Sequence, residues 1–186
     1  MWEILGNDSQ ALTMVLKPNE VATCRPGAVI TRDDSINIVE NAGWLDIEAR
    51  EKYVNSSQRL SQSMTFVAPF SSSKIVSIRM VHPIVVRPGA WLASKGADVL
   101  FEFGEGGLPV VSGTAPTFIC GRGTIISRML ARGESIVAKK SSFLACARTV
   151  QVKEHWSLCV LLFGCDYRLT GPGMVLLQSL NAAHLF

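Results

Sequence analysis

The sequence predicts an all-β protein, and two observations lead to that prediction. Short segments of about five residues, in which apolar and polar residues alternate, are separated by turn residues about every 8–12 positions. In addition, one pattern recurs along the chain: a cation, then residues typical of a turn, then two apolar residues. Strands of this length and punctuation are typical of sandwiches and barrels. We therefore expect a β architecture built from a repeated supersecondary unit.

The recurring pattern reads Arg-Pro-Gly-Ala plus two apolar residues in its first two copies and Lys-Lys-Ser-Ser-Phe-Leu in the third. The three copies occupy residues 25–30, 87–92 and 139–144. Their central residues are Gly27, Gly89 and Ser141, at spacings of 89 − 27 = 62 and 141 − 89 = 52 positions. An apolar residue stands eleven positions before each centre. Such self-similarity indicates one unit used three times.

We predict a single domain over residues 1–186, with repeats at 3–45, 64–113 and 114–180. Residues 48–63 are polar and only weakly periodic, so we interpret them as an insertion with one or two helical turns. Glycine supplies the turns at Gly27, Gly89, Gly171 and Gly173. In chain order, the expected strands are 14–16, 21–24, 29–30, 35–39, 75–80, 84–86, 99–103, 124–130, 135–138, 149–152, 158–163 and 174–177.

The composition predicts both an unusually full core and some surface that is covered by other subunits. Hydrophobic residues make up 48% of the chain and charged residues only 18%, against a usual charged fraction of about a quarter. The net charge of +3 is far from the footprint of a dedicated nucleic-acid binder. Residues 156–165 form the longest apolar run, which is too short for a membrane helix of about 20 residues. We predict no transmembrane segment.

The first residues lack the basic and apolar regions of a secretory signal, so we do not expect secretion. Five cysteines without a Cys-x-x-Cys pair fit buried thiols in a reducing compartment. No catalytic residue, metal site or cofactor is predicted, because nucleophile elbows and phosphate loops are absent from the sequence. Only three histidines occur, and they are scattered. A set of His155, Cys159 and Cys165 matches no common zinc spacing.

Three cations share one position of the repeat, two residues before its centre: Arg25, Arg87 and Lys139. If a pseudo-threefold axis relates the repeats, these side chains form a ring that contacts an anion or an RNA backbone. The alternative is that they are exposed turn residues that keep sheet edges charged.

Several segments resemble a known family. Residues 3–20 read E-I-x-G-x3-Q-x-L-x3-L-x-P-x-E, and Gly27-Ala28 follows. Residues 123–134 read G-T-x6-A-x-G-E, and residues 169–179 read L-x-G-P-G-x-V-x-L-Q-S. These motifs resemble the altered-inheritance-of-mitochondria (AIM twenty-four) family over nearly the whole chain.

The resemblance implies a fold similar to the tryptophan RNA-binding attenuation protein, with short double-stranded β-helix repeats in a pseudo-threefold barrel. It also implies a non-enzymatic role, ring-like oligomers, and a mitochondrial location in a eukaryote or a cytoplasmic one in a bacterium. Peripheral membrane association is left open.

We accordingly expect a structural or assembly protein whose partners are copies of itself or other subunits. The alternative is an RNA-binding component of a ribonucleoprotein complex, which the three cations would serve. A third hypothesis is an enzyme whose pocket is assembled from dispersed residues.

Overall fold

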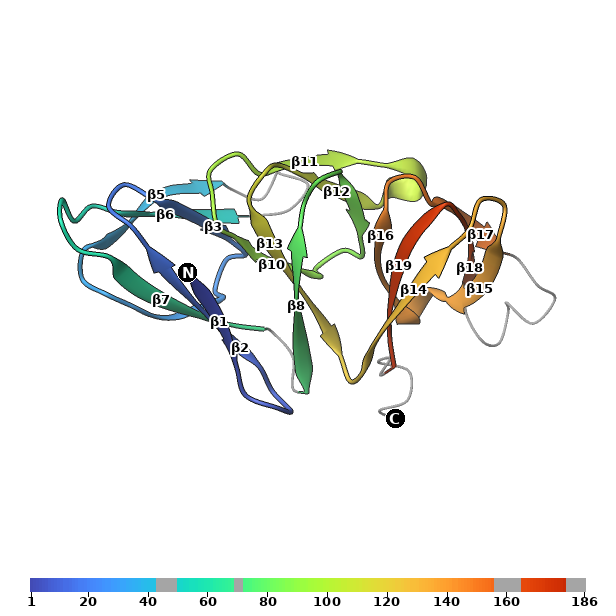
Figure 1. The fold of residues 1–186 in the computed structure, drawn as a ribbon, viewed down its shortest axis with the longest axis horizontal. Coiled ribbons are helices and arrows are strands. Elements are labelled where there is room, and N and C mark those ends of the chain that lie inside the picture. The colour runs from blue at the N-terminus through green and yellow to red at the C-terminus, as the bar shows by residue number, and fades with distance from the viewer. Residues whose placement is uncertain (43–49, 69–71, 156–164, 180–186) are drawn as a thin grey trace.

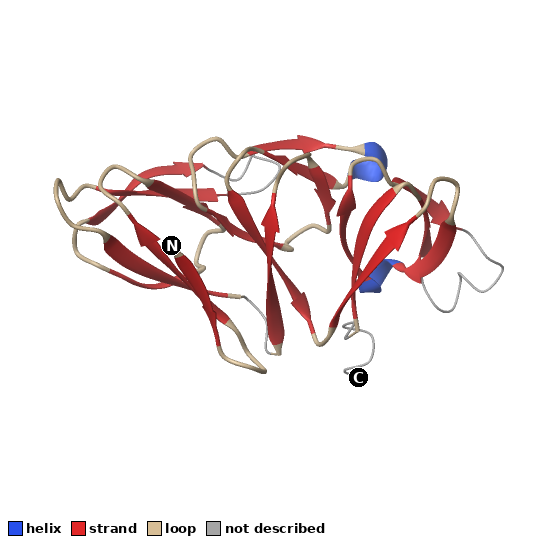
Figure 2. Cartoon of the chain, in the orientation of Figure 1, coloured by secondary structure: helices blue, strands red, loops and turns tan. Residues whose placement is uncertain are grey.

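The computed structural model describes residues 1–42, 50–68, 72–155 and 165–179. Antiparallel strands dominate these residues, with two short 3₁₀ helices, η1 (Glu105–Gly107) and η2 (Lys140–Ser142), between them (Figure 2). The all-β prediction is confirmed. The expected strand at 158–163 lies outside the described residues.

The strands group into three units of six, preceded by β1 (Trp2–Leu5), which pairs with β2. Unit one comprises β2 (Ala11–Leu16), β3 (Val21–Cys24), β4 (Val29–Arg32), β5 (Ile36–Ala42), β6 (Arg50–Asn55) and β7 (Gln62–Val67). Unit two comprises β8 (Ser73–Arg79), β9 (Ile84–Val86), β10 (Trp91–Ser94), β11 (Leu100–Phe103), β12 (Pro109–Ser112) and β13 (Pro116–Arg122). Unit three comprises β14 (Ile125–Leu130), β15 (Ser135–Lys139), β16 (Phe143–Ala147), β17 (Gln151–His155), β18 (Asp166–Thr170) and β19 (Gly173–Gln178).

Each unit contributes two three-stranded sheets. We call the sheet that holds the strand before the corner the leading sheet; its orders are β3–β6–β5, β9–β12–β11 and β15–β18–β17. The trailing sheet holds the strand after the corner; its orders are β2–β7–β4, β8–β13–β10 and β14–β19–β16. The three units follow one another along the long axis of the molecule (Figure 1). The sheet pairing therefore repeats strand for strand.

Neighbouring units are joined by one strand pair each. The leading sheet of unit one continues into the trailing sheet of unit two through β3–β10, and unit two continues into unit three through β9–β16. Each strand after a corner also carries an irregularity at the same place. The bulge lies between Val29 and Thr31 in β4, and between residues 91 and 93 in β10 and 143 and 145 in β16.

The core consists of three apolar clusters, one per unit, and each also takes residues from a neighbouring unit. The apolar residues eleven positions before each corner centre, Leu16, Ile78 and Leu130, are all buried. Alternation accounts for this, because successive side chains of a strand point to opposite faces and one face covers the core. In β2 the pattern is strict: Leu12, Met14 and Leu16 are buried and their neighbours only half-buried.

Two boundaries differ from the sequence prediction. Residues 50–55 form β6, which pairs with β3 and β5, so the expected helical insertion is wrong there. Alternate residues Tyr53 and Asn55 face the core, and the buried polar Asn55 hid the strand pattern from the sequence. The pairing also places β7 in unit one, outside the predicted first repeat at 3–45, and β13 in unit two, whereas the prediction had put it in the third repeat at 114–180.

Candidate functional site: the repeated corners and the sheet edges

The corners of units one and two are built alike. Each is a turn in which the alanine N–H donates to the arginine carbonyl: Ala28 to Arg25 at 3.2 Å and Ala90 to Arg87 at 3.0 Å. The central glycines adopt φ values of +72° and +74°, in the left-handed region that glycine enters without a Cβ clash. The third corner is the 3₁₀ helix η2, which accommodates serine at the centre.

Each of these two corners also begins a junction between units. The N–H of Arg25 donates to the carbonyl of Leu92 in β10 at 2.9 Å. The N–H of Arg87 donates to the carbonyl of Leu144 in β16 at 2.8 Å. The acceptor is in both cases the third residue after the centre of the next corner. The two junctions therefore follow one rule.

The Arg25 guanidinium holds the next corner. Its Nη1 donates to the carbonyl oxygen of Gly89 at 2.8 Å and would lie only 3.1 Å from a Cβ on that glycine. The side chain is half-buried in this position. Arg25 thus bridges two corners of the same chain.

The half-buried Arg87 also faces inward. Burial lowers the pKa of its guanidinium, and the charge of Arg122 lowers it further. Its Nε is buried and has no hydrogen-bond partner within the described residues. The positive charges of Arg25 and Arg87 each act to lower the pKa of the Cys120 thiol, against the larger effect of its burial. Both arginines therefore lie near Cys120.

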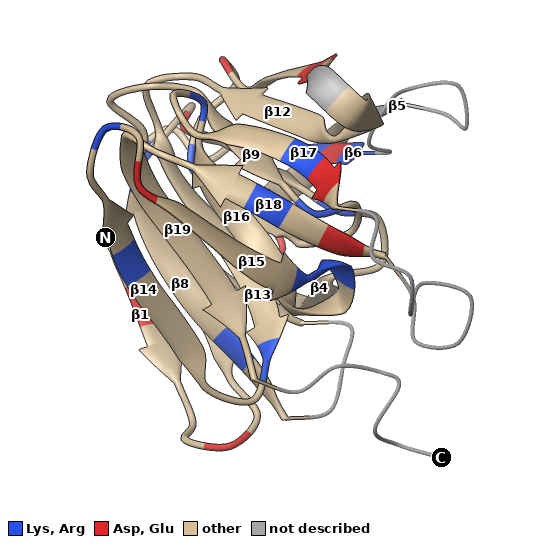
Figure 3. Cartoon of the chain, turned by 90° about the vertical axis from the view of Figure 1, so that its right-hand side faces the viewer, with Lys and Arg blue, Asp and Glu red and all other residues tan. Residues whose placement is uncertain are grey.

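Lys139, by contrast, is exposed at the end of β15. It is not among the residues described above as interacting with Arg25 or Arg87. The structure therefore does not show the ring of three cations that a pseudo-threefold arrangement predicts. Lys and Arg are interspersed with Asp and Glu over the end of the molecule formed by β17 and β18 (Figure 3). An anion or RNA contact of Arg25, Arg87 and Lys139 stays a prediction.

Three of the cysteines are buried, and burial governs their chemistry. It raises the pKa of Cys120 to about 11 and that of Cys146 to about 12, and it also raises the pKa of Cys24. Cys165 is half-buried, and Cys159 lies outside the described residues. Nucleophilic attack needs the thiolate, so the three buried thiols are unreactive at neutral pH.

We expect no more than two of the five thiols to react with a disulfide reagent within minutes at pH 8, because only about one Cys120 in a thousand is ionised there. All five should react in urea. Since the folded pKa of Cys120 lies above the ordinary 9.0, its contribution to stability is complete below pH 9 and declines toward pH 11. Rapid reaction of four or five thiols in the native protein would contradict the buried placement.

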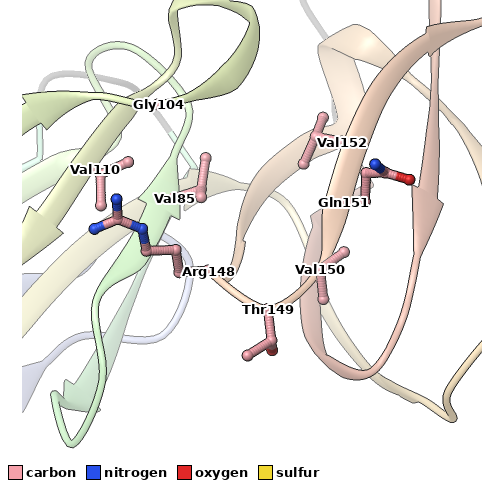
Figure 4. A pocket seen from close by; sticks show the side chains of 8 residues that line it. All are labelled: Val85, Gly104, Val110, Arg148, Thr149, Val150, Gln151 and Val152. Carbon is pink, nitrogen blue, oxygen red and sulfur yellow. The ribbon is translucent and has the colours of Figure 1, made fainter.

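A groove of about 360 Å³ lies between units two and three (Figure 4). Arg148 is the sole ionisable residue among its lining residues, and its guanidinium is ion-paired with Glu102. The rest of the lining is mostly aliphatic, and its other polar side chains are Thr149 and Gln151. Such a lining offers no pair of groups for acid–base or nucleophilic chemistry. Within the described ranges, no three His, Cys, Asp or Glu side chains are grouped as a metal ion requires.

Apolar side chains are exposed instead along the edge strands. Ile30 of β4 is 57% exposed and Val137 of β15 is 51% exposed. Others share this property on β5, β11 and β14: Ile38, Val39, Leu100, Phe103, Ile126 and Met129. Where the structure describes the chain, β4 pairs only with β7, and β15 only with β18. The alternation of apolar and polar residues predicts that β4 and β15 are strands. It does not predict which strands have an unpaired edge, because that depends on the order of the strands in the sheets.

Comparisons place the chain among known proteins. A crystal structure of a protein from Streptococcus pyogenes has a TM-score of 0.80 with this chain at 14% identity, over 99% of this chain and 95% of that one. That similarity shows the shared fold. A search of curated proteins found no match. No helix among the described residues is long and apolar enough to cross a membrane.

The model of one protein family, described as Mitochondrial biogenesis AIM24, matches residues 2–180. This range includes all three units and every corner described above. The motifs at 3–20, 123–134 and 169–179 lie within it. The chain therefore belongs to the AIM24 family.

Proposed function

We propose that the protein is a non-enzymatic structural subunit that acts by assembling with copies of itself or with other proteins, in mitochondria if its source is eukaryotic. The observation that carries the proposal is the open edges of the two terminal sheets, β1 and β4 in one and β15 and β17 in the other, each of which pairs on one side only within the described residues. Unpaired edges present rows of N–H and C=O groups that favour pairing with another chain. The family description, mitochondrial biogenesis, is compatible with an assembly role.

The side chains at these edges support the same proposal. Natural monomers protect an edge with charges, bulges or covering segments. The two edges do carry a bulge in β4 and the exposed charges of Arg32 and Lys139, but they also carry Ile30 and Val137, both more than half exposed. Burying them against another protein would recover hydrophobic free energy of about 25 cal/mol per Å². The groove between units two and three, in contrast, lacks the groups that an enzyme needs.

Light scattering coupled to size exclusion tests the proposal. At tens of micromolar we expect a mass that is a multiple of 20.2 kDa, or a stable complex with co-purifying proteins identified by mass spectrometry. Dilution should reduce the mass if the assembly is reversible. A monomer of 20.2 kDa at every concentration, without any bound protein, would overturn the proposal.

A further inference from the structure

We propose that the second corner is a binding site for a small oxyanion such as phosphate, with Arg87 and Arg122 as its ligands and Arg25 beside them. Unlike the ring of cations that the sequence suggests, this site includes Arg122 and leaves out Lys139. The inference goes beyond the proposed assembly function and does not depend on it.

The second corner lies against the end of β13. The N–H of Cys120 in β13 donates to the carbonyl of Ala90 in the corner at 2.7 Å. Arg122 ends β13 two residues later, so it lies alongside the corner that begins with Arg87. The charge of Arg122 acts on the guanidinium of Arg87, as expected of two neighbouring cations.

Unit one supplies a third guanidinium at the same corner. Arg25 Nη1 donates to the carbonyl of Gly89 at 2.8 Å. This bond uses one of the five N–H donors of the group. The charges of Arg25 and Arg87 both act on Cys120. Three half-buried arginines from two units therefore surround one corner.

The repeat assigns Arg87 a structural partner that another side chain has taken. Arg25 holds the carbonyl at the centre of the next corner, and the equivalent carbonyl for Arg87 is that of Ser141. Here, however, Gln178 Nε2 donates to the Ser141 carbonyl at 2.9 Å. The side chain of Arg87 makes no hydrogen bond within the described residues, and its Nε is buried.

A difference between units two and three explains why Arg87 is left over. Cys120 and Gln178 occupy equivalent positions, because each directly follows the residue that pairs with the first aromatic residue after its corner. The short thiol of Cys120 leaves the corner carbonyl to Arg25. The longer Gln178 reaches its corner carbonyl itself, and its Oε1 accepts from the N–H of Arg122 at 3.1 Å. The guanidinium of Arg87 is therefore not needed to hold the third corner.

Arg25 and Arg87 have no carboxylate partner within the described residues. The described ion pairs involve other cations, and no described carboxylate acts on the charge of Arg87. The thiol of Cys120 cannot supply the negative charge, because burial raises its pKa to about 11 and keeps it neutral at pH 7. A partly desolvated cation beside a second cation is unfavourable unless an anion compensates it. The corner therefore favours an anion.

The available donors suit a tetrahedral oxyanion. A guanidinium presents a planar fork of N–H groups that can bond two oxygens of a phosphate group at once. The whole fork of Arg87 is available, since no described residue accepts from it. Because the arginines are half-buried and the Nε of Arg87 is buried, a small anion reaches them more readily than a nucleic-acid backbone does.

Titration calorimetry with inorganic phosphate tests the proposal. We expect one phosphate per chain with a Kd of about 1 mM or tighter. At about ten times the Kd, phosphate should raise the unfolding temperature by about 3–5 °C relative to sodium chloride of equal ionic strength. R87Q should bind phosphate at least about tenfold more weakly. R79Q changes an exposed arginine at the opposite end of the β8–β13 pair and should keep the wild-type affinity.

Thermal unfolding in chloride and in phosphate separates an anion ligand from a structural residue. In chloride, R87Q should unfold at or above the wild-type temperature, because it removes the repulsion from Arg122. In phosphate, the wild type should be the more stable protein. R122Q should also lose the response to phosphate, and it keeps the test decisive if R87Q does not fold. K139Q should retain the response.

A loss of stability that is equal in chloride and in phosphate for R87Q and R122Q would mean that these arginines only support the fold, and it would overturn the proposal. A response lost in K139Q would contradict the composition of the site.

Further ligands decide the source of the phosphate group. Glycerol 3-phosphate, a soluble phosphate monoester, should bind about as inorganic phosphate does. Vesicles that contain phosphatidic acid, and a single-stranded RNA, should show no binding that R87Q abolishes. Such binding in the absence of any phosphate affinity would overturn the small-anion site. A wild-type protein that ignores phosphate would do so too, and it would leave the proposed assembly function untouched.

Discussion

Trp91→Ala is expected to lower the free energy of unfolding by about 3–5 kcal/mol. Trp91 follows the second corner, is fully buried, and lies at the bulge of β10. Its ring meets Phe101 edge to face at 4.8 Å between centroids, and its Nε1 donates to Ser94 Oγ at 3.0 Å. Truncation would leave a large cavity where two units meet. Urea unfolding followed by circular dichroism measures the loss.

Matched variants at the same repeat position provide the controls. Phe143, also fully buried, packs edge to face on Tyr167, so F143A should cost about 3–5 kcal/mol too. Val29 is only half-buried, and V29A should cost about 1 kcal/mol or less. W91F keeps an aromatic ring and leaves Ser94 bonded to Thr117 at 2.8 Å, so its loss should be smaller. Equal losses for W91A and V29A would contradict the difference in burial between these two equivalent positions.

Asn55→Ala is expected to cost about 2–4 kcal/mol. The side chain is 0% exposed at the end of β6. Its Nδ2 donates to the carbonyls of Leu16 and Leu60, both at 2.9 Å, and its Oδ1 accepts from the N–H of Ser57 at 2.9 Å. Alanine would leave all three backbone groups without this partner. The expected cost is less than that of leaving three fully buried backbone groups without a hydrogen bond, because Leu60 and its neighbours are exposed and water can bond them.

The matched control for Asn55 is Asn37, which is exposed and donates to Ser56 Oγ at 3.0 Å. N37A should change the free energy of unfolding by less than about 0.5 kcal/mol. Thermal or urea unfolding of both variants measures the difference between their free energies of unfolding. If N55A were as mild as N37A, the loop after β6 would not depend on the buried amide.

The sequence could predict the features that depend on local periodicity. The positions of Gly27 and Gly89 correctly marked two equivalent turns, since a positive φ there requires glycine. Leu16, Ile78 and Leu130 were recognisable because alternation puts one residue in two on the core face.

Other features depended on distant contacts. Arg25 looks like an exposed turn residue in sequence, yet its partner is the carbonyl of Gly89, 64 residues away. The strand β6 was missed because Asn55, a polar residue, occupies a core position where hydrogen bonds satisfy it. That β4 and β15 end the array follows only from the order of the sheets.

Hydrogen–deuterium exchange at two protein concentrations tests the central claim most directly, because it observes the edge amides themselves. We predict that segments 29–33 and 135–139 exchange more slowly at high concentration than at high dilution, since the proposed assembly covers these open edges. Segment 36–39 of β5, an edge strand outside the two terminal sheets, should exchange alike at both concentrations. Unchanged exchange in 29–33 and 135–139, under conditions where light scattering shows an assembly, would contradict the account.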